Sequence, residues 1–310
     1  MRVRGERECR ECGRHWSYFE TGSVECPTCG SLRSVGTGDR ESHTDAPVDL
    51  DLHEHRQRFA ETTSVLPTEG VTDLKRDLRA YVHKRGFVHA GELTELDATY
   101  LAARELLEAV DVYDRLRQPT ADDQAYLLDL LAGADSGDRP HATDVPTAMR
   151  SARGMATALA VETYREALTT YLMESTARTE ASSHHNASNH HNASSHHNAS
   201  NHHNASSRTD TPDSLPQRHE ESGTVPASQP HESESPQRTQ LDRLRERLRD
   251  RTNQITALQG DVDPVVADEL VRATRAIYAT LTTDGENTLD RANAHLDRAD
   301  AHLDDAALSR

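Results

Sequence analysis

The feature that most constrains this chain is a pair of C-x-x-C motifs near its amino-terminal end. The motifs contain all four cysteines of the 310 residues, namely Cys9, Cys12, Cys26 and Cys29. A C-x-x-C turn directs two thiolates at one ion, and two such turns supply the four ligands of a tetrahedral structural zinc site. A glycine follows each motif, where the turn needs a positive φ. We therefore predict one structural Zn²⁺ held by these four cysteines, with no position left for water or substrate.

Disulfides and iron are the alternatives to zinc. Disulfides are disfavoured because the sequence shows no secretory signal and places every cysteine in a C-x-x-C pair. Iron stays open, since the Cys26–Gly30 segment is similar to a rubredoxin knuckle and ligand softness does not separate the two metals. A rubredoxin-like electron-transfer protein of the rubrerythrin type would also need Glu-x-x-His motifs, and the sequence contains none. His15 is expected to be a neighbour of the site or a surface residue rather than a ligand, because four thiolates suffice.

The segment between the motifs predicts a small antiparallel sheet. Trp16 and Tyr18 alternate with polar residues as in a strand, Gly22 belongs to a turn, and Val24 begins the return strand. Residues 1–38 are therefore expected to form a zinc ribbon. Its aromatic side chains are expected to cover the small core rather than stack on nucleic-acid bases, because so short a unit has little else to bury.

The chain as a whole is strongly acidic. Asp and Glu outnumber Lys and Arg by 52 to 35, and only Lys75 and Lys84 are lysines. This composition is typical of proteins adapted to molar salt, where surface carboxylates keep a protein soluble. The ribbon carries six arginines against five glutamates, so it is the one region that does not repel a phosphate backbone. No apolar run approaches the ~18 residues of a membrane span, and we expect a cytoplasmic protein.

Beyond the ribbon, the hydrophobic spacing is mostly helical. Residues 39–50 are rich in small polar residues and are expected to be a linker, and residues 51–178 predict an all-α bundle. Its helices are expected from about Leu52 to Phe59, from Gly70 to Gly86, from Thr94 to Gln118, from Thr120 to Gly133, and from Pro146 onward. The predicted fold class is thus a small zinc ribbon followed by mostly α-helical bundle regions.

The second of these helices carries the most basic stretch of the chain, formed by Lys75, Arg76, Arg79 and the run His83–Arg85. A phosphate-binding face is one interpretation of this stretch. Interaction of the last cations with the helix dipole and ordinary solvation of the others explain the same charges more simply, and we favour that explanation.

The last two segments differ sharply in composition. Residues 179–237 contain a His-His-Asn-Ala-Ser (HHNAS) repeat that begins at His184, followed by a polar tract, so a disordered low-complexity linker is expected. Residues 238–308 predict an α-helical hairpin or three-helix segment, in which a coiled-coil heptad of Leu and Ile is broken at Arg251 and Leu alternates with Ala from Leu289 onward. Intramolecular packing of these helices is favoured over self-association, and a homo-oligomer through 238–308 stays open.

The first sixty residues resemble the amino-terminal part of haloarchaeal proteins described as transcription factor IIB-type (TFIIB-type) zinc-ribbon-containing. The resemblance runs through Arg4–Cys9, Trp16–Pro27 and Gly30–Gly36, and extends to Tyr81–Phe87. It implies that the four cysteines bind zinc in a ribbon. The cyclin-like repeats of the full transcription factor are not evident, so promoter binding is not implied. The repeat and the residues after it look like an insertion or extension particular to this chain.

Function is less constrained than fold. The sequence contains no phosphate-binding Gly loop, no Gly-x-Ser-x-Gly elbow and no His-Glu-x-x-His motif, so an enzyme is not expected. We expect a non-enzymatic interaction adapter with a protein partner, and docking on transcription machinery is one form of it. A nucleic-acid-binding, transcription-associated regulator is the alternative. At ~1 M salt the screening length is ~3 Å and phosphate affinity falls steeply, which favours the protein partner.

Overall fold

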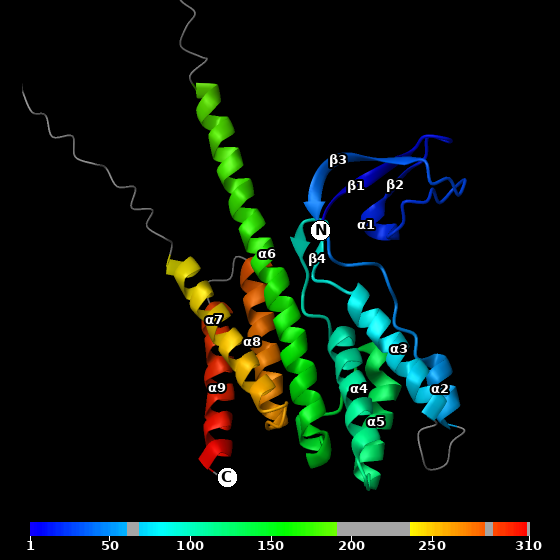
Figure 1. Ribbon diagram of the computed structural model, residues 1–310. Helices are drawn as coiled ribbons and strands as arrows, with labels where there is room; N and C mark the ends of the chain where they lie inside the picture. The colour runs from blue at the N-terminus through cyan, green and yellow to red at the C-terminus, as the bar shows by residue number, and fades with distance from the viewer. Residues whose placement is uncertain (61–67, 191–235, 283–287, 309–310) are drawn as a thin grey trace, which may run out of the picture. The chain divides into compact units, whose positions relative to one another are not determined.

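The computed structural model describes residues 1–60, 68–190, 236–282 and 288–308 (Figure 1). Met1–Ser175 and Pro236–Arg310 form one compact unit, and Thr176–Ser235 form a second. Most of the segment that the sequence predicts to be a disordered linker, residues 191–235, lies outside the described residues. Its first part is described, and there residues 179–190 form the end of helix α6 (Arg150–His190).

A three-stranded antiparallel sheet forms the amino-terminal region. Strands β2 (His15–Ser17) and β3 (Ser34–Ser42) lie on either side of the central strand β1 (Arg2–Cys9). The observed strands differ from those that the sequence predicts. Val24 lies outside the strands, and the residues of β3 are extended where the sequence suggests the end of the ribbon and a linker. The reason is that β1 offers β3 a partner for its backbone N–H and C=O groups.

A one-turn helix covers the sheet near its centre. Tyr18 begins helix α1 (Tyr18–Thr21) instead of continuing the strand. The helix brings the buried ring of Phe19 against Gly5 of β1. A Cβ on Gly5 would lie 1.9 Å from an atom of that ring, so only glycine allows the contact. The β1–β3 register shifts at the same place, between Arg4 and Glu6.

The bundle helices form where the hydrophobic spacing predicts them. They are α2 (His53–Ala60), α3 (Thr68–Lys84), α4 (Ala98–Arg115), α5 (Ala121–Gly133) and α6 (Arg150–His190). The start signal of α5 is confirmed, since Thr120 forms a capping box with Asp123. Helix α4 begins later than expected, because Asp97 rather than Thr94 accepts the cap hydrogen bond from the N–H of Thr99.

Short elements connect these helices. A two-stranded hairpin of β4 (Val88–His89) and β5 (Glu92–Leu93) lies between α3 and α4, and three 3-10 turns lead from α5 to α6, namely η1 (Ala134–Ser136), η2 (Ala142–Asp144) and η3 (Thr147–Met149). The N–H of Thr44 donates to the Val88 carbonyl at 2.9 Å. The hydroxyl of Ser42 donates to Glu174 of α6 at 2.7 Å. The end of β3 is thus hydrogen-bonded to the helical part of the unit.

The carboxy-terminal helices α7 (Pro236–Ala257), α8 (Pro264–Thr282) and α9 (Thr288–Leu308) lie side by side (Figure 1). Their apolar side chains share one core with those of α3 to α6, and the Leu/Ala stripe of α9 is buried from Leu289 to Leu303. A heptad would place Arg251 of α7 at a buried position. The buried residue is Thr252 instead, because the helix packs with 3.6 residues per turn rather than with the 3.5 of a coiled coil. None of the described helices has an apolar stretch long enough to cross a bilayer.

One backbone contact between α6 and the turn after α7 leaves no room for a side chain. A Cβ on Gly154 would lie 2.1 Å from the carbonyl oxygen of Gly260, and a Cβ on Gly260 would lie 2.3 Å from the carbonyl oxygen of Ser151. Gly260 also has a φ of +78°, in the left-handed region. The two glycines therefore allow the carboxy-terminal segment to approach α6 this closely.

A buried network of charges joins four helices of the unit. The fully buried carboxylate of Glu105 in α4 accepts hydrogen bonds from Arg153 of α6 at 3.1 Å and from Arg139 at 2.8 Å. Arg153 also donates to Asp268 of α8 at 2.7 Å, and the Tyr126 hydroxyl of α5 donates to Glu105. Burial, and next the Glu105 carboxylate, raise the pKa of Tyr126. Two arginines and two carboxylates balance their charges, so the buried Glu105 and Arg153 each have a partner of opposite sign.

We expect the substitution Arg153→Met to lower the free energy of unfolding by about 3–5 kcal/mol, because it leaves Glu105 buried without one of its cations. The matched control is Arg165→Met on the same helix, which removes only the partly exposed pair with Glu162 and should cost no more than about 1 kcal/mol. Urea unfolding followed by far-UV circular dichroism measures both. Equal losses in the two variants would contradict the role given to the network.

Candidate metal centre

The two cysteine pairs lie on turns of the same geometry. The N–H of Gly13 donates to the Cys9 carbonyl at 3.0 Å, and the N–H of Gly30 donates to the Cys26 carbonyl at 2.9 Å. The two glycines have φ values of +71° and +69°, as their place after each motif predicts. The first turn follows β1 and the second precedes β3, and Cys9 pairs with Ser34 between these strands. The sheet therefore brings the two turns together.

The four sulfur atoms form one compact cluster. All lie within 4.8 Å of one another, and the Sγ–Sγ distance is 3.6 Å both between Cys9 and Cys29 and between Cys12 and Cys26. Tetrahedral bonds of about 2.3 Å to one ion would place sulfurs about 3.8 Å apart, whereas a disulfide bond measures about 2.05 Å. The four predicted ligands are free thiols arranged to bind one metal ion.

The pKa values of the thiols indicate that the four cysteines do not all ionise together without a cation. Burial raises the pKa of Cys26, but the N–H groups of Cys29 and Thr28 and the adjacent thiols lower it to about 6. The N–H of Ser31 lowers the pKa of Cys29, yet Cys12, burial and the other thiols raise it to about 12. One thiolate thus forms readily and opposes the ionisation of its neighbours. Four thiolates exist together when a cation lies between them.

The side chains around the cluster take the places that the sequence suggests. Trp16 is buried with Cys9 and Cys26 in a small core of its own, and its indole N–H donates to the Ser23 carbonyl at 3.1 Å. The ring covers the metal-binding turns, so its face is not available to a base. His15 is exposed on β2 and is not part of the sulfur cluster.

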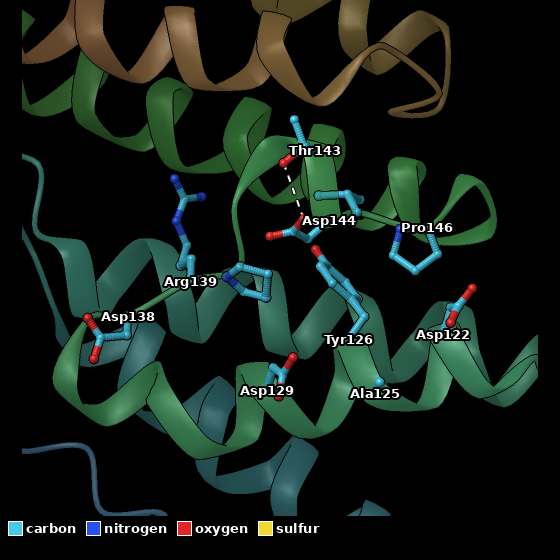
Figure 2. Close-up of a pocket in the computed structure, with 11 residues that line it drawn as sticks. Asp122, Ala125, Tyr126, Asp129, Asp138, Arg139, Thr143, Asp144 and Pro146 are labelled. Carbon is cyan, nitrogen blue, oxygen red and sulfur yellow. Dashed lines mark hydrogen bonds between the residues drawn. The ribbon is translucent and has the colours of Figure 1, made fainter.

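A second candidate site is a hollow of about 670 Å³ between α5 and the connection that leads to α6 (Figure 2). Its lining includes four aspartates, Asp122, Asp129, Asp138 and Asp144. Figure 2 shows the Arg139 guanidinium extending away from Asp138, and this guanidinium belongs to the buried network with Glu105. The Tyr126 hydroxyl is bonded to the same carboxylate. These two groups serve the core, and we assign no chemistry to the hollow.

Glu105 and Arg153 are not among the residues predicted to form a site, although the hydrophobic pattern contains a signal for both. Arg153 precedes the buried Ala156 by three residues and Ala160 by seven on α6, and Glu105 follows the buried Leu101 by four residues on α4. A charge at a position that helical spacing assigns to the core predicts a buried partner of opposite sign.

A family model matches most of the chain. The model describes a family of unknown function and matches residues 1–197 and 228–296. No curated protein and no solved structure matches the chain significantly. The family match includes the metal-binding turns and also α7, α8 and part of α9. The expectation that everything after the start of the repeat is particular to this chain is therefore wrong for these helices, whereas residues 198–227 fall outside the match.

We expect one bound metal ion per chain, and we expect Cys12→Ser to lose it, because three thiolates bind the ion more weakly than four. Trp16 is the only tryptophan, so its fluorescence reports on the ribbon while far-UV circular dichroism reports on the helices. The variant should shift the Trp16 emission to the red and leave the helical signal unchanged. The control variant His15→Gln should keep both the metal and the emission spectrum. Full metal content in the Cys12→Ser variant would refute the ligand assignment.

Proposed function

The chain belongs to this family of unknown function, DUF7117, and we propose that it is a non-enzymatic zinc-ribbon protein that serves as an interaction adapter. The observation that carries the proposal is the cluster of four Sγ atoms within 4.8 Å of one another. Four thiolates fill a tetrahedral coordination sphere, so the ion has no position for a substrate or a reactive water. Its role is to fold the ribbon, which has little apolar core of its own.

Zinc is the ion that we propose for this site. Ligand type alone allows zinc or iron. A rubrerythrin-like electron-transfer protein would need a second metal centre of His and carboxylate ligands, and no such group is found within residues 1–60, 68–190, 236–282 and 288–308.

Elemental analysis of purified protein should therefore give one zinc per chain and a colourless solution. Stoichiometric iron with visible charge-transfer absorption would contradict the adapter function and favour an electron-transfer function.

The ribbon exposes two large apolar side chains beside the second metal-binding turn. Val24 is 44% exposed and Leu32 is 71% exposed. Ser34 ties the two segments together, since its hydroxyl donates to the Val24 carbonyl at 2.7 Å. The metal-binding turn lies between these residues in the chain, so the ion orders both. An ordered pair of exposed apolar side chains supports a contact with a protein partner.

Two further observations favour a protein over a nucleic acid. Trp16 and Phe19 are buried, so their rings do not offer stacking platforms. The net charge of −17 repels a polyanion, and salt at ~1 M screens phosphate contacts beyond ~3 Å. We therefore extend the proposal to a TFIIB-type ribbon that docks on transcription machinery through protein contacts, in a haloarchaeal cytoplasm.

A nucleic-acid-binding regulator is the second candidate, and one feature of the ribbon favours it. Arg10 and Arg14 are exposed on the first metal-binding turn, and neither forms a salt bridge with any residue that the structure describes. Arg33, by comparison, pairs with Glu11 at 2.6 Å. The two unpaired arginines offer contacts to phosphates.

Capture of partners by the tagged full-length protein in concentrated KCl, with and without nuclease, separates the two candidates. We expect a protein partner that survives nuclease, because apolar contacts hold it, and that is lost from the double variant Val24→Ser, Leu32→Ser. The control variant Leu128→Ser removes an exposed leucine of α5 and should keep the partner. Unchanged metal content would show that both variants keep the ribbon. Loss of the partner on nuclease treatment, or in Arg10→Gln, Arg14→Gln alone, would favour the regulator.

A further inference from the structure

A hollow of about 690 Å³ between α3, α4 and α6 has a basic lining. Its polar lining residues are Arg79, His83, Arg85, Tyr100, Arg104 and Thr163, and the others are aliphatic. No aspartate or glutamate of the described ranges lines it. In a chain of net charge −17 this is a local excess of positive charge, and it contrasts with the aspartate-lined hollow beside α5.

Most of the basic stretch of α3 is already neutralised by neighbouring carboxylates. Three of its cations have partners within 3.1 Å, namely Lys75 with Asp111, Arg76 with Asp73, and Arg85 with Asp45 and Asp97. Arg79 differs from these three. Its distance to Asp111 is 3.8 Å, and that carboxylate lies closer to Lys75. The stretch is therefore mainly a set of ion pairs, and it leaves Arg79 and His83 to the hollow.

Arg104 supplies the central cation from the neighbouring helix. Its Nε and Nη2 atoms donate to the Tyr100 hydroxyl at 3.2 and 3.0 Å, and its guanidinium carbon lies 5.4 Å from the centre of the Tyr100 ring. Glu108, one turn further along α4, acts on it through the electric field, but no salt bridge to Arg104 occurs within the described part of the chain. One edge of the guanidinium is thus fixed, and the other edge, formed by Nη1 and the second N–H of Nη2, stays available for a ligand.

We propose that this hollow binds a small molecule that carries a phosphate group. A planar guanidinium held along one edge is preorganised for two parallel hydrogen bonds to phosphate oxygens. Arg79 adds a second cation and His83 a ring N–H donor. The volume suits a compound of mononucleotide size, and the aliphatic walls accept its uncharged part. A nucleic-acid strand carries the same group, but the net charge of −17 of the whole chain repels a long polyanion.

The test uses the full-length, metal-loaded protein at about 1 M KCl, where weak surface contacts are screened. Inorganic phosphate is followed by line broadening in ³¹P NMR, and AMP by calorimetry. We expect both to bind and Arg104→Gln to weaken binding about tenfold or more, because the charged bidentate contact is lost. Arg79→Gln should weaken it by a smaller factor. Arg76→Gln on the same helix removes an exposed, paired arginine outside the hollow and should leave the affinity unchanged.

The proposal is overturned if neither probe binds, or if Arg104→Gln binds as tightly as the unmodified protein. If Arg104→Gln loses its helical circular dichroism signal, the affinity of Arg79→Gln is the test. Unchanged affinity of Arg79→Gln also overturns the proposal. A single-stranded oligonucleotide without a terminal phosphate distinguishes the sources of the phosphate group. Binding of the oligonucleotide without binding of AMP would replace the small molecule with a nucleic-acid strand.

Discussion

Four thiolates around one cation are the constraint on which the amino-terminal region depends. Apart from this site, the ribbon buries little more than Trp16 and Phe19, and full burial of such side chains stabilises by only about 1.5–3 kcal/mol each. A structural zinc site contributes about 10–16 kcal/mol in small domains. We therefore expect the ion to contribute most of the stability of the ribbon. The order of Val24 and Leu32, the apolar residues that we assign to a partner, depends on the same ion.

The helical part of the unit is held together by a different principle. Apolar packing is non-directional and accepts several arrangements of similar helices. The network of Glu105, Arg153, Arg139 and Asp268 accepts few, because each buried charge must meet its own partner at hydrogen-bond distance. This requirement fixes α8 against α4 and α6. It is also a physical reason for α8, which comes after the repeat in sequence, to fall within the family match together with α4 and α6.

The sequence predicts the features that neighbouring residues decide, and it misses those that distant residues decide. The two C-x-x-C motifs, the start of α5 at Thr120 and the Leu/Ala spacing of α9 are local patterns, and the structure contains a cysteine cluster, a capped helix start and a buried stripe at these places. Strand β3 is not local. Gly36 resembles a linker residue until β1 lies beside it, where a Cβ would approach Arg4 to 2.9 Å. Arg104 and Glu105 are consecutive residues of α4. Helical spacing does not reveal that Arg104 lines a basic hollow while Glu105 belongs to a buried network.

The contact between Gly154 and Gly260 bears on how descent could be traced within the family. A side chain at either position would push the turn after α7 away from α6, so related chains that keep this contact must keep both glycines. Cysteine spacing identifies only the ribbon, which many unrelated proteins share. The glycine pair marks the helical part instead, whatever the length of the segment inserted between the two positions. It would identify a member that had lost its metal-binding turns and retained only the helices.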